Sequence, residues 1–326
     1  MENNTILFFG GTGSLGYNFI SKNINNNTIY NYSRDECKHW NIEKKFPKLK
    51  NIIGDIRDKE KVKYALNLIK PNIIIIASAM KHVDKCEYDT GECIKTNILG
   101  VQNIINSIIE LENSIAFKNV IFISTDKACS PVNTYGMCKA ISEKMISEAA
   151  YKSNTIKYNI VRYGNVLNSR GSIIPLLHSL GKNEDVKELT LTDVRMTRFI
   201  MTLDESCKLI EYAIEHGNNG ETIVPEIISM YVKDLFEIFS ELYNKKTLVT
   251  KLRSGEKLYE SLINGTQYQL QYKKNGYYHI IPNFDGKLLT QEQVDLNSNM
   301  NIISKECLQD KLLKMGCLDV NYTDSF

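Results

Sequence analysis

A short apolar run leads directly into a glycine-rich loop near the start of the chain. Thr5–Phe9 has the composition of a β-strand, and Gly10-Gly11-Thr12-Gly13-Ser14-Leu15-Gly16 follows it before a segment with helical periodicity. Glycine permits a tight turn, brings the backbone close to a phosphate and lets the helix pack on the strand. The free amides of the helix would point at that phosphate. This order predicts an α/β fold that binds a dinucleotide.

The first half of the chain continues to alternate strands and helices. The expected strands are Thr5–Phe9, Thr28–Tyr32, Lys50–Ile53, Ile73–Ala77, Val120–Ser124 and Lys157–Arg162. The expected helices are Leu15–Lys22, Lys59–Ile69, Cys93–Leu111 and Tyr135–Tyr151, with a further one over Leu203–Glu215. Continuously apolar strands are typical of a parallel sheet that is covered on both faces. We therefore predict a doubly wound parallel (Rossmann) sheet.

Beyond residue 165 the alternation loosens into turns and mixed segments. We expect a cofactor-binding domain over residues 1–165, with a segment near 199–224 that returns to it. Residues 166–326 are expected to form a smaller substrate-binding lobe and a C-terminal extension. The lobe would close over a ligand at the carboxyl edge of the sheet.

Composition excludes several classes of function. The 326 residues carry a net charge of +2, and their basic residues are scattered, which argues against nucleic-acid or membrane-surface partners. The eight cysteines have no CxxC pair or metal-type spacing, so we expect no metal site. No apolar stretch approaches the roughly 20 residues that span a bilayer, and we expect no signal peptide before the first strand. We expect a cytoplasmic enzyme without nucleic-acid or membrane partners.

The second predicted strand ends in Ser33-Arg34 rather than in an acidic residue. A carboxylate there would hold the ribose 2′-hydroxyl of NAD, whereas Arg34, helped by Lys38, would neutralise the 2′-phosphate of NADP. We therefore expect NADP. Asp35, one position later, keeps NAD as the alternative. Asp55, after the third strand, is expected to face adenine, and a helix cap is the alternative for it.

Tyr135 and Lys139 are four residues apart, so they share one helix face. Pro131 and Asn133 break the chain after the fifth strand, which puts Tyr135 at the carboxyl edge of the sheet. The Lys139 ammonium and an oxidised nicotinamide would stabilise a phenolate and lower its pKa from the ordinary value of about 10. Tyr135 would then accept a hydroxyl proton while hydride leaves the same carbon.

This pairing, together with the glycine-rich loop, resembles the extended short-chain dehydrogenase/reductases. A longer set of motifs resembles the inverting UDP-N-acetylglucosamine 4,6-dehydratases, which also epimerise C5. The motifs are Ser124-Thr125-Asp126-Lys127-Ala128, Arg162-Tyr163-Gly164-Asn165-Val166, Ser169-Arg170-Gly171-Ser172, Asp193-Val194-Arg195-Met196-Thr197-Arg198-Phe199 and Gly255-Glu256-Lys257. The resemblance covers about residues 5 to 263. Asp84 and Ser254 stand where family members usually carry proline.

The resemblance implies a reaction that suits these residues. Once C4 of the hexose is a ketone, the C5 proton is acidic and the C6 hydroxyl can leave. Asp126 would protonate the departing hydroxyl, and a neutral Lys127 would remove the C5 proton. Thr125 would orient the C4 hydroxyl for Tyr135. Hydride return to C6 and protonation of C5 from the other face would give the L-arabino 4-keto sugar, a first step toward N-acetylated 6-deoxy-L-sugars.

The expected residues fall into three groups. The catalytic residues are Thr125, Asp126, Lys127, Tyr135 and Lys139. The cofactor-binding residues are Gly10, Thr12, Gly13, Ser14, Leu15, Gly16, Ser33, Arg34, Lys38, Asp55, Ile56, Ala77, Tyr135 and Lys139. The substrate-binding residues are Lys81, His82, Asn165, Arg170, Arg195, Arg198, Arg253 and Glu256, with the arginines suited to a diphosphate.

Two other functions compete with this interpretation. A nucleotide-sugar 4-epimerase needs no acid–base pair beside C5 and C6, so Asp126-Lys127 argues against it. A non-catalytic protein that senses NADP would not need Tyr135, Lys139 and Asp126 together. We expect a UDP-N-acetylhexosamine as substrate. We also expect a homo-oligomer built on dimers that pair through Cys93–Leu111 and Tyr135–Tyr151, with a hexamer as a larger alternative.

Overall fold

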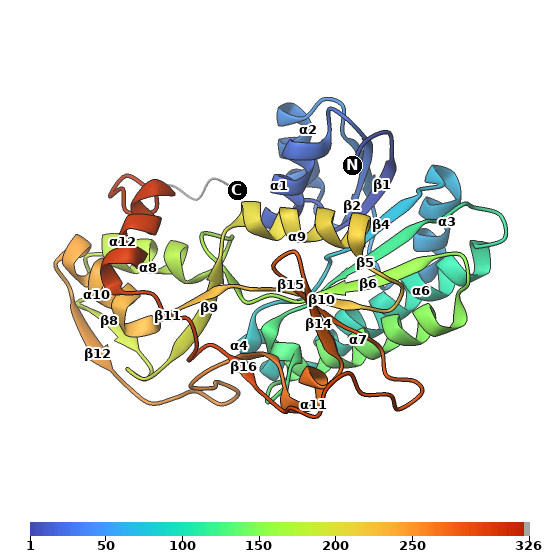
Figure 1. Cartoon of the computed structure of the whole chain (residues 1–326). Coiled ribbons are helices and arrows are strands. Elements are labelled where there is room, and N and C mark those ends of the chain that lie inside the picture. The colour runs from blue at the N-terminus through green and yellow to red at the C-terminus, as the bar shows by residue number, and fades with distance from the viewer. Residues whose placement is uncertain (323–326) are drawn as a thin grey trace.

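The computed structural model describes residues 1–322, and Figure 1 shows a large sheet flanked by helices beside a smaller lobe. The sheet has nine strands in the order β14-β15-β10-β6-β5-β4-β1-β2-β3. Their bounds are β1 (Thr5–Phe9), β2 (Thr28–Ser33), β3 (Lys50–Ile53), β4 (Ile73–Ile76), β5 (Asn119–Ile123), β6 (Lys157–Val161), β10 (Thr222–Pro225), β14 (Gln271–Lys274) and β15 (Tyr277–Ile280). All neighbours from β10 to β3 are parallel, and the β14–β15 hairpin adds antiparallel to β10.

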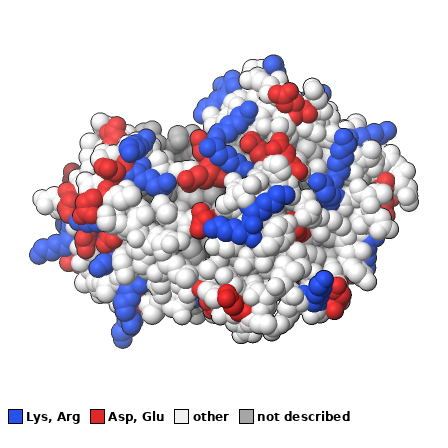
Figure 2. All heavy atoms as spheres, viewed as in Figure 1, with Lys and Arg blue, Asp and Glu red and all other residues white. Residues whose placement is uncertain are grey.

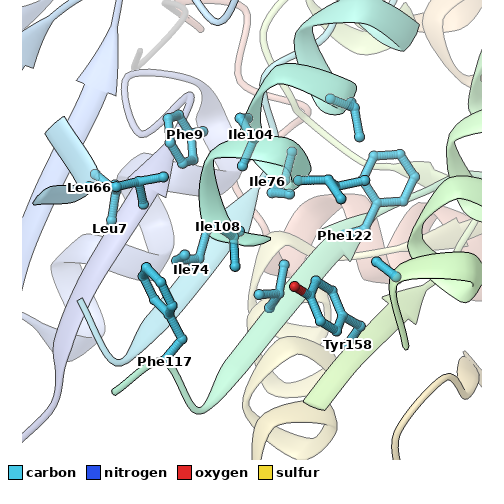
Figure 3. Close-up of a cluster of buried hydrophobic side chains, with 14 of the residues drawn as sticks. Leu7, Phe9, Leu66, Ile74, Ile76, Ile104, Ile108, Phe117, Phe122 and Tyr158 are labelled. Carbon is cyan, nitrogen blue, oxygen red and sulfur yellow. The ribbon is translucent and has the colours of Figure 1, made fainter. Parts of the chain in front are cut away.

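Helices cover both faces of this sheet. One face carries α3 (Lys59–Ile69), α6 (Gly100–Leu111) and α7 (Thr134–Lys152), and the other carries α1 (Ser14–Asn23), α2 (Glu36–Lys45) and α9 (Leu203–His216). The side chains of Leu66, Ile104 and Ile108 pack against Leu7 and Phe122 from the sheet (Figure 3). Burial on both faces explains why the central strands are apolar without alternation. The predicted doubly wound parallel sheet is confirmed.

The predicted elements match closely, with three differences. Helix α2 and the short α4 (Val83–Tyr88) were not expected. The expected helix Cys93–Leu111 consists of α5 (Thr90–Ile94), a π-helical turn (Lys95–Leu99) and α6. Within that turn, the side chain of Asn97 binds both the amide and the carbonyl of Met80, in the loop after β4, at 2.8 and 2.9 Å. The π-helical turn thus carries a side chain that binds the loop after β4, and the apolar periodicity of the sequence does not indicate such a turn.

The smaller lobe is assembled from the second half of the chain. Its elements are β7 (Asn165–Val166), α8 (Ile173–Lys182), β8 (Glu188–Leu191), β9 (Thr197–Met201), β11 (Ile228–Tyr231), α10 (Val232–Tyr243), β12 (Lys246–Val249), β13 (Ser261–Ile263), α11 (Gly265–Tyr268), β16 (Leu296–Asn297) and α12 (Lys305–Lys314). They form sheets β11-β9-β7, β12-β8 and β13-β16. A second core, which includes Leu177, Leu235, Phe239 and Leu308, lies between α8, α10 and α12. Strands β10, β14 and β15, which come after residue 165, belong to the main sheet, so a division of the chain at this residue stays a proposal. Residues 323–326 of the expected C-terminal extension lie outside the described part of the chain.

The buried Arg162 joins the main sheet to the later part of the chain. Its guanidinium donates to both carboxylate oxygens of Glu143 on α7, at 3.0 and 2.5 Å. It also donates to the carbonyl of Leu262 on β13 and to the Gln267 side chain on α11, both at 2.8 Å. Ser124, just after β5, donates to the same Glu143 at 2.5 Å. The pair therefore holds α7 and β13 at fixed positions beside the sheet.

Removing one charge of this pair should destabilise the protein strongly. We expect Glu143→Gln to lower the free energy of unfolding by about 3 kcal/mol, because it leaves the Arg162 charge buried without a counter-ion. Urea unfolding followed by circular dichroism measures the change. Glu148→Gln on the same helix is the matched control, since the exposed Glu148–Lys152 pair should contribute at most about 1 kcal/mol. Equal losses in the two variants would contradict the assignment.

Candidate active site

A cavity of about 750 Å³ lies at the carboxyl edge of the parallel strands. Its walls come from the glycine-rich loop, the ends of β2 to β5, the start of α7 and the segment from Tyr163 to Ile174. Ligands bind at this edge in doubly wound folds because the strand order reverses there and leaves a crevice. On the face of the molecule in Figure 2, basic and acidic side chains are interspersed. This face therefore shows no large surface patch of one charge beside the cavity.

The glycine-rich loop lies at one end of this cavity, which Gly10, Thr12, Gly13, Ser14, Leu15 and Gly16 all line. A side chain at Gly16 would come within 2.4 Å of the Cα atom of Gly11, so only glycine lets α1 pack this closely on the loop. Gly13 occupies the N-cap of α1 and provides no side-chain cap. The first amides of the helix therefore remain available for a phosphate.

The end of β2 provides the groups expected at a ribose. Ser33, Arg34 and Lys38 line the cavity, and the side chain of Arg34 is 58% exposed, with Nη1 3.5 Å from the carboxylate of Asp55. Asp35 accepts from the backbone amide of Lys38 as the N-cap of α2, and it forms an ion pair with the Lys38 amine at 2.9 Å. Its carboxylate is thus engaged with its own helix.

Asp55, Ile56 and Ala77 line the same part of the cavity. Burial alone would raise the pKa of Asp55, but hydrogen bonds and charge from Arg57, with the charge of Arg34, hold it below its ordinary value. Helix α3 is capped by Asp58 rather than by Asp55. The alternative that Asp55 serves as the cap of this helix is therefore wrong.

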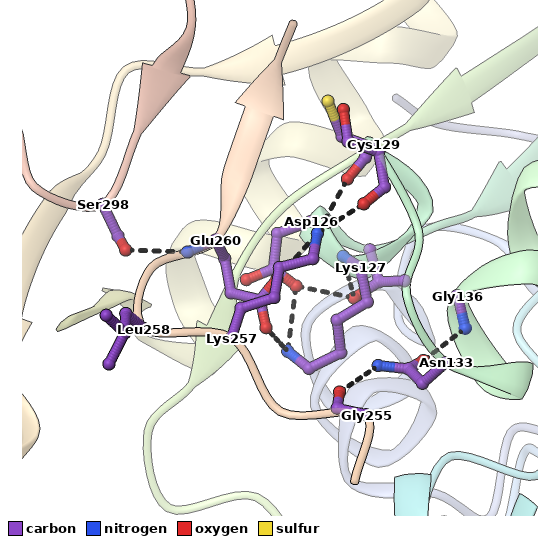
Figure 4. Close-up of polar contacts among 12 residues, drawn as sticks. Asp126, Lys127, Cys129, Asn133, Gly136, Gly255, Lys257, Leu258, Glu260 and Ser298 are labelled. Atoms are coloured by element: carbon purple, nitrogen blue, oxygen red, sulfur yellow. Dashed lines mark hydrogen bonds and ion pairs between the residues drawn. The ribbon is translucent and has the colours of Figure 1, made fainter. Parts of the chain in front are cut away.

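The turn Thr125–Lys127, which we call the catalytic turn because it contains the predicted acid–base pair, follows β5. The amine of Lys127 lies 3.1 Å from Oδ1 of Asp126, and that oxygen also accepts from the Thr125 hydroxyl at 2.8 Å. Thr125 and Lys127 line the cavity, whereas the fully buried Asp126 is absent from its lining among the described residues, so its action on the C6 hydroxyl stays a prediction. Lys127 thus lies at the cavity wall, and its amine is held by the buried Asp126 carboxylate (Figure 4).

Helix α7 brings Tyr135 and Lys139 to the cavity wall beside this turn. Asn133 caps the helix by accepting from the amide of Gly136 at 2.8 Å. A side chain at Gly136 would meet the carbonyl oxygen of Lys127 at 2.2 Å, so this glycine permits direct packing of the helix on the catalytic turn. Lys139 donates to the carbonyl of Ile123 at 2.7 Å. The structure therefore brings the amine of Lys127 and the phenol of Tyr135 to one cavity.

The protein alone does not lower the pKa of the Tyr135 phenol. Burial raises it, the charge of Asp126 raises it further, and a hydrogen bond with Thr125 acts in the opposite direction. Burial also lowers the pKa of the Lys139 amine to about 8, against opposing charge from Glu143. The expectation that Lys139 lowers the pKa of Tyr135 is not met within the protein, because both groups are removed from water.

The expected substrate-binding residues divide into two sets. Lys81, His82, Asn165 and Arg170 line the cavity. Arg170 also contacts the glycine-rich loop, since its backbone amide donates to Ser14 at 2.8 Å and its guanidinium to the carbonyl of Thr12 at 3.4 Å. The backbone carbonyl of Arg170 also accepts from the amine of Lys81. The segment around Arg170 therefore lies against the glycine-rich loop.

The remaining expected residues do not line this cavity in the part of the chain that the structure describes. Arg195 is exposed and paired with Asp193, beside a second hollow on the surface. Arg198 is nearly buried and donates to backbone carbonyls, including that of Lys257 at 3.1 Å. The backbone amide of the exposed Arg253 donates to Glu256 at 2.9 Å. Their role at a diphosphate stays a prediction.

Glu260 was missed by sequence reasoning, and Lys257 was named only within a motif and given no role, although both lie next to the catalytic turn. One carboxylate oxygen of Glu260 is 3.9 Å from the amine of Lys127, and the other is 3.6 Å from the amine of Lys257. No spacing rule links residue 260 to residue 127. Within residues 1–322, no His, Cys, Asp and Glu group could hold a metal, and no helix is long and apolar enough to cross a membrane.

Comparison with known proteins agrees with the fold and the motifs. The model of the polysaccharide biosynthesis protein family matches residues 6–282. A UDP-N-acetylglucosamine 4,6-dehydratase (inverting) from Campylobacter jejuni is 40% identical, covering 85% of this chain and 82% of the relative. A UDP-glucose 4-epimerase from Rickettsia rickettsii is 36% identical over the same shares of the two chains. The crystal structure of Pen from Bacillus thuringiensis is similar with a TM-score of 0.89, 32% identity, and coverage of 98% of this chain and 99% of that one.

The resemblance to inverting 4,6-dehydratases that the motifs indicated is confirmed by these relationships. The fold, the cavity and the family match all concern the same part of the chain, because residues 6–282 contain the glycine-rich loop, the catalytic turn and helix α7. The chain belongs to the polysaccharide biosynthesis protein family.

Proposed function

We propose that this protein is a UDP-N-acetylglucosamine 4,6-dehydratase that also inverts C5. Its product would be UDP-2-acetamido-2,6-dideoxy-L-arabino-4-hexulose, the precursor of N-acetylated 6-deoxy-L-sugars. The observation that carries the proposal is the presence of Lys127 and Tyr135 on one cavity with a glycine-rich loop. The 40% identical relative of that name supports the same substrate.

The cofactor is proposed to be NADP, with NAD as the alternative. It would supply a hydride acceptor for C4 and a hydride donor for C6. The amides after Gly13 would hold its pyrophosphate, and Arg170, which contacts this loop, would add a positive charge. The exposed guanidinium of Arg34 and the amine of Lys38 suit a 2′-phosphate, while the carboxylate of Asp35 is engaged with its own helix.

Tyr135 is proposed to take the proton of the C4 hydroxyl as hydride leaves C4, with Thr125 orienting that hydroxyl. Because burial raises the pKa of the phenol, proton transfer requires positive charge near it. The ammonium of Lys139 provides part of that charge from the same helix face. Removal of the hydroxyl proton and of the hydride converts C4 into a ketone.

Lys127 is proposed to act on C5 and Asp126 on the C6 hydroxyl. The amine removes the C5 proton, the C5–C6 double bond forms, and the C6–O bond breaks with a proton from the carboxylic acid, so water is released. Hydride return to C6 and protonation of C5 from the opposite face complete the inversion. A 4-epimerase would need neither step, and the contact between Lys127 and Asp126 at 3.1 Å supports the dehydratase.

Three further properties are proposed with this function. The chain would divide into a cofactor-binding part and a substrate-binding lobe near residue 165. Exposed apolar side chains on α6 and α7, such as Ile109, Met137 and Ile141, suit pairing of two copies in a homo-oligomer. All eight cysteines are free thiols, which suits the reducing cytoplasm.

The central experiment separates C4 oxidation from C5 chemistry. We expect the wild-type protein, incubated with UDP-N-acetylglucosamine in D₂O, to form a 4-keto-6-deoxy sugar with deuterium at C5. Lys127→Met should still reduce the bound cofactor but should lose C5 labelling and product by at least about 100-fold, because a general base contributes this much. NMR of the sugar and absorbance of the reduced cofactor report the two steps.

Two results would count against the dehydratase. Formation of UDP-N-acetylgalactosamine by the wild-type protein would establish the 4-epimerase instead. Binding of NADP without turnover of UDP-N-acetylglucosamine would favour the sensing protein. Retention of C5 labelling in Lys127→Met would remove Lys127 from its role as base.

The pH dependence should reflect the ionisation of Lys139. Burial lowers its pKa to about 8, so its ammonium is present below that pH and is lost as the pH rises through it. We expect kcat/KM, which reports the free enzyme, to decline above about pH 8. Steady-state rates across the alkaline range check this. A value that stays constant to about pH 10 would exclude a need for the Lys139 charge.

Cofactor preference should depend on Arg34. We expect Arg34→Ala to weaken NADP binding by roughly tenfold or more and to change NAD binding little, because a charge-assisted contact to the 2′-phosphate is lost. Isothermal titration calorimetry with each cofactor measures both affinities. Arg57→Ala is the matched control, since Arg57 also pairs with Asp55. A parallel loss of NADP and NAD affinity in Arg34→Ala would refute 2′-phosphate recognition.

A further inference from the structure

Glu260 places a second carboxylate beside the proposed catalytic amine. It directly precedes β13, it is 3% exposed, and its Oε1 lies 3.9 Å from Nζ of Lys127. The same amine is 3.1 Å from Oδ1 of Asp126. Lys127 thus lies between two buried carboxylates, those of Asp126 and Glu260, which are 134 positions apart in the sequence (Figure 4).

Each of these carboxylates has an oxygen without a hydrogen-bond partner among the described residues. The two oxygens are Oδ2 of Asp126 and Oε2 of Glu260, and both are shielded from solvent. Oε2 of Glu260 does lie 3.6 Å from the Lys257 amine, which is an ion pair beyond hydrogen-bond distance. Buried carboxylate oxygens are normally hydrogen-bonded, so spare acceptor capacity beside an amine requires an explanation. Acceptance of a proton from Lys127 is one such explanation; the 3.9 Å between Oε1 of Glu260 and Nζ of Lys127 is also an ion-pair distance and must shorten for the transfer.

The segment that carries Glu260 is fastened to the catalytic turn and to the loop after it. The amine of Lys257 donates to the carbonyls of Cys129 and Ser130 at 3.2 and 2.6 Å. The side chain of Asn133 donates to the carbonyl of Gly255 at 2.9 Å. The backbone amide of Glu260 itself donates to the Ser298 hydroxyl at 3.0 Å. These contacts hold the Glu260 carboxylate in a fixed position relative to Lys127.

Lys257 does not take the place of Lys127. Its amine is occupied by two backbone carbonyls, and Lys257 is absent from the cavity lining among residues 1–322. Lys127 lines the cavity, with 19% of its side chain exposed. A proton released by Lys127 therefore has Asp126 and Glu260 as its neighbouring acceptors. Under the proposed function, Asp126 must already hold a proton in order to protonate the leaving hydroxyl, so the carboxylate of Glu260 is the acceptor that remains.

We propose that Glu260 is the positioning residue of Lys127 and accepts the proton that the amine must release before it can act as a base. This inference rests on the proposed function. In the transfer, an N–H bond of the ammonium breaks and an O–H bond of the Glu260 carboxyl forms, with no change in oxidation state. A charged pair becomes a neutral pair, so the total charge of the cluster is unchanged.

The surroundings of Glu260 make this transfer reasonable. Burial raises the pKa of its carboxyl, and the charge of Asp126 raises it further. The charges of Lys127, Arg198 and Lys257 act in the opposite direction. A carboxyl that is hard to ionise is a suitable acceptor for a proton from a buried amine, because neutralising both groups removes the cost of keeping two charges away from water.

Glu260→Gln tests the inference because it keeps the shape of the side chain and removes the proton acceptor. With UDP-N-acetylglucosamine in D₂O, we expect kcat and C5 labelling to fall by at least roughly tenfold, with KM changed less than about threefold. Formation of reduced cofactor in a single turnover should keep the wild-type rate. In the wild type we expect kcat to fall toward low pH as Glu260 becomes protonated, and this fall should be absent from the Glu260→Gln variant.

Two further variants complete the experiment. Glu260→Asp keeps a carboxylate and should recover part of the C5 labelling and the fall of kcat toward low pH. Glu237→Gln on α10, whose side chain is half exposed and paired with Lys305, is the matched control and should behave as the wild type. Melting temperatures of all variants report folding. If Glu260→Gln does not fold, recovery of labelling in a folded Glu260→Asp supports the inference, and its absence overturns it.

The results that overturn the inference differ from those that overturn the proposed function. Wild-type C5 labelling and pH profile in Glu260→Gln would exclude a proton-accepting role. Equal losses of C4 oxidation and of C5 labelling would reduce Glu260 to structural support, which also overturns it. A wild-type protein that forms no 4-keto sugar would instead refute the dehydratase itself.

Discussion

The buried guanidinium of Arg162 is the contact on which the arrangement of the site depends. A positive charge without solvent requires a counter-ion, and Glu143 on α7 supplies it through two hydrogen bonds. The remaining donors reach Leu262 and Gln267, which belong to β13 and α11. One residue at the end of β6 therefore fixes both the helix that carries Tyr135 and Lys139 and the strand that follows Glu260. Arg162 therefore fixes the position of α7, with Tyr135 and Lys139, relative to the segment that carries Glu260.

The site itself is a concentration of ionisable groups in a region with little water. Asp126 and Glu260 flank Lys127, while Tyr135 and Lys139 are buried on the adjacent helix face. Burial opposes the charged form of each type of group, raising the pKa of Tyr135 and lowering that of Lys139. The neutral forms of both groups are therefore favoured, and a proton transfer that neutralises two neighbouring charges is favoured with them.

Residues close in sequence were predictable, and residues that meet only through folding were not. Apolar runs indicated the strands of the parallel sheet, since burial on both faces leaves a continuous signal. The Tyr135–Lys139 spacing indicated a shared helix face, and both line the cavity. In contrast, the sequence suggested Arg198 for a diphosphate, whereas in the folded chain its guanidinium donates to backbone carbonyls. Glu260 lies beside Lys127 although no sequence spacing links the two residues. Helix α2 was missed because its sequence has few apolar residues and follows a site motif.

By itself, the sequence determined the sheet, the loop for the dinucleotide and the presence of an amine, a carboxylate and a phenol near the carboxyl edge. These follow from local patterns, because strand burial, glycine geometry and helix periodicity act over a few residues. Only the tertiary structure decided that Lys127 lines the cavity while Asp126 is buried outside its lining, and that Glu260 comes to the same amine. Such relations depend on how distant segments pack, which one segment's sequence does not specify.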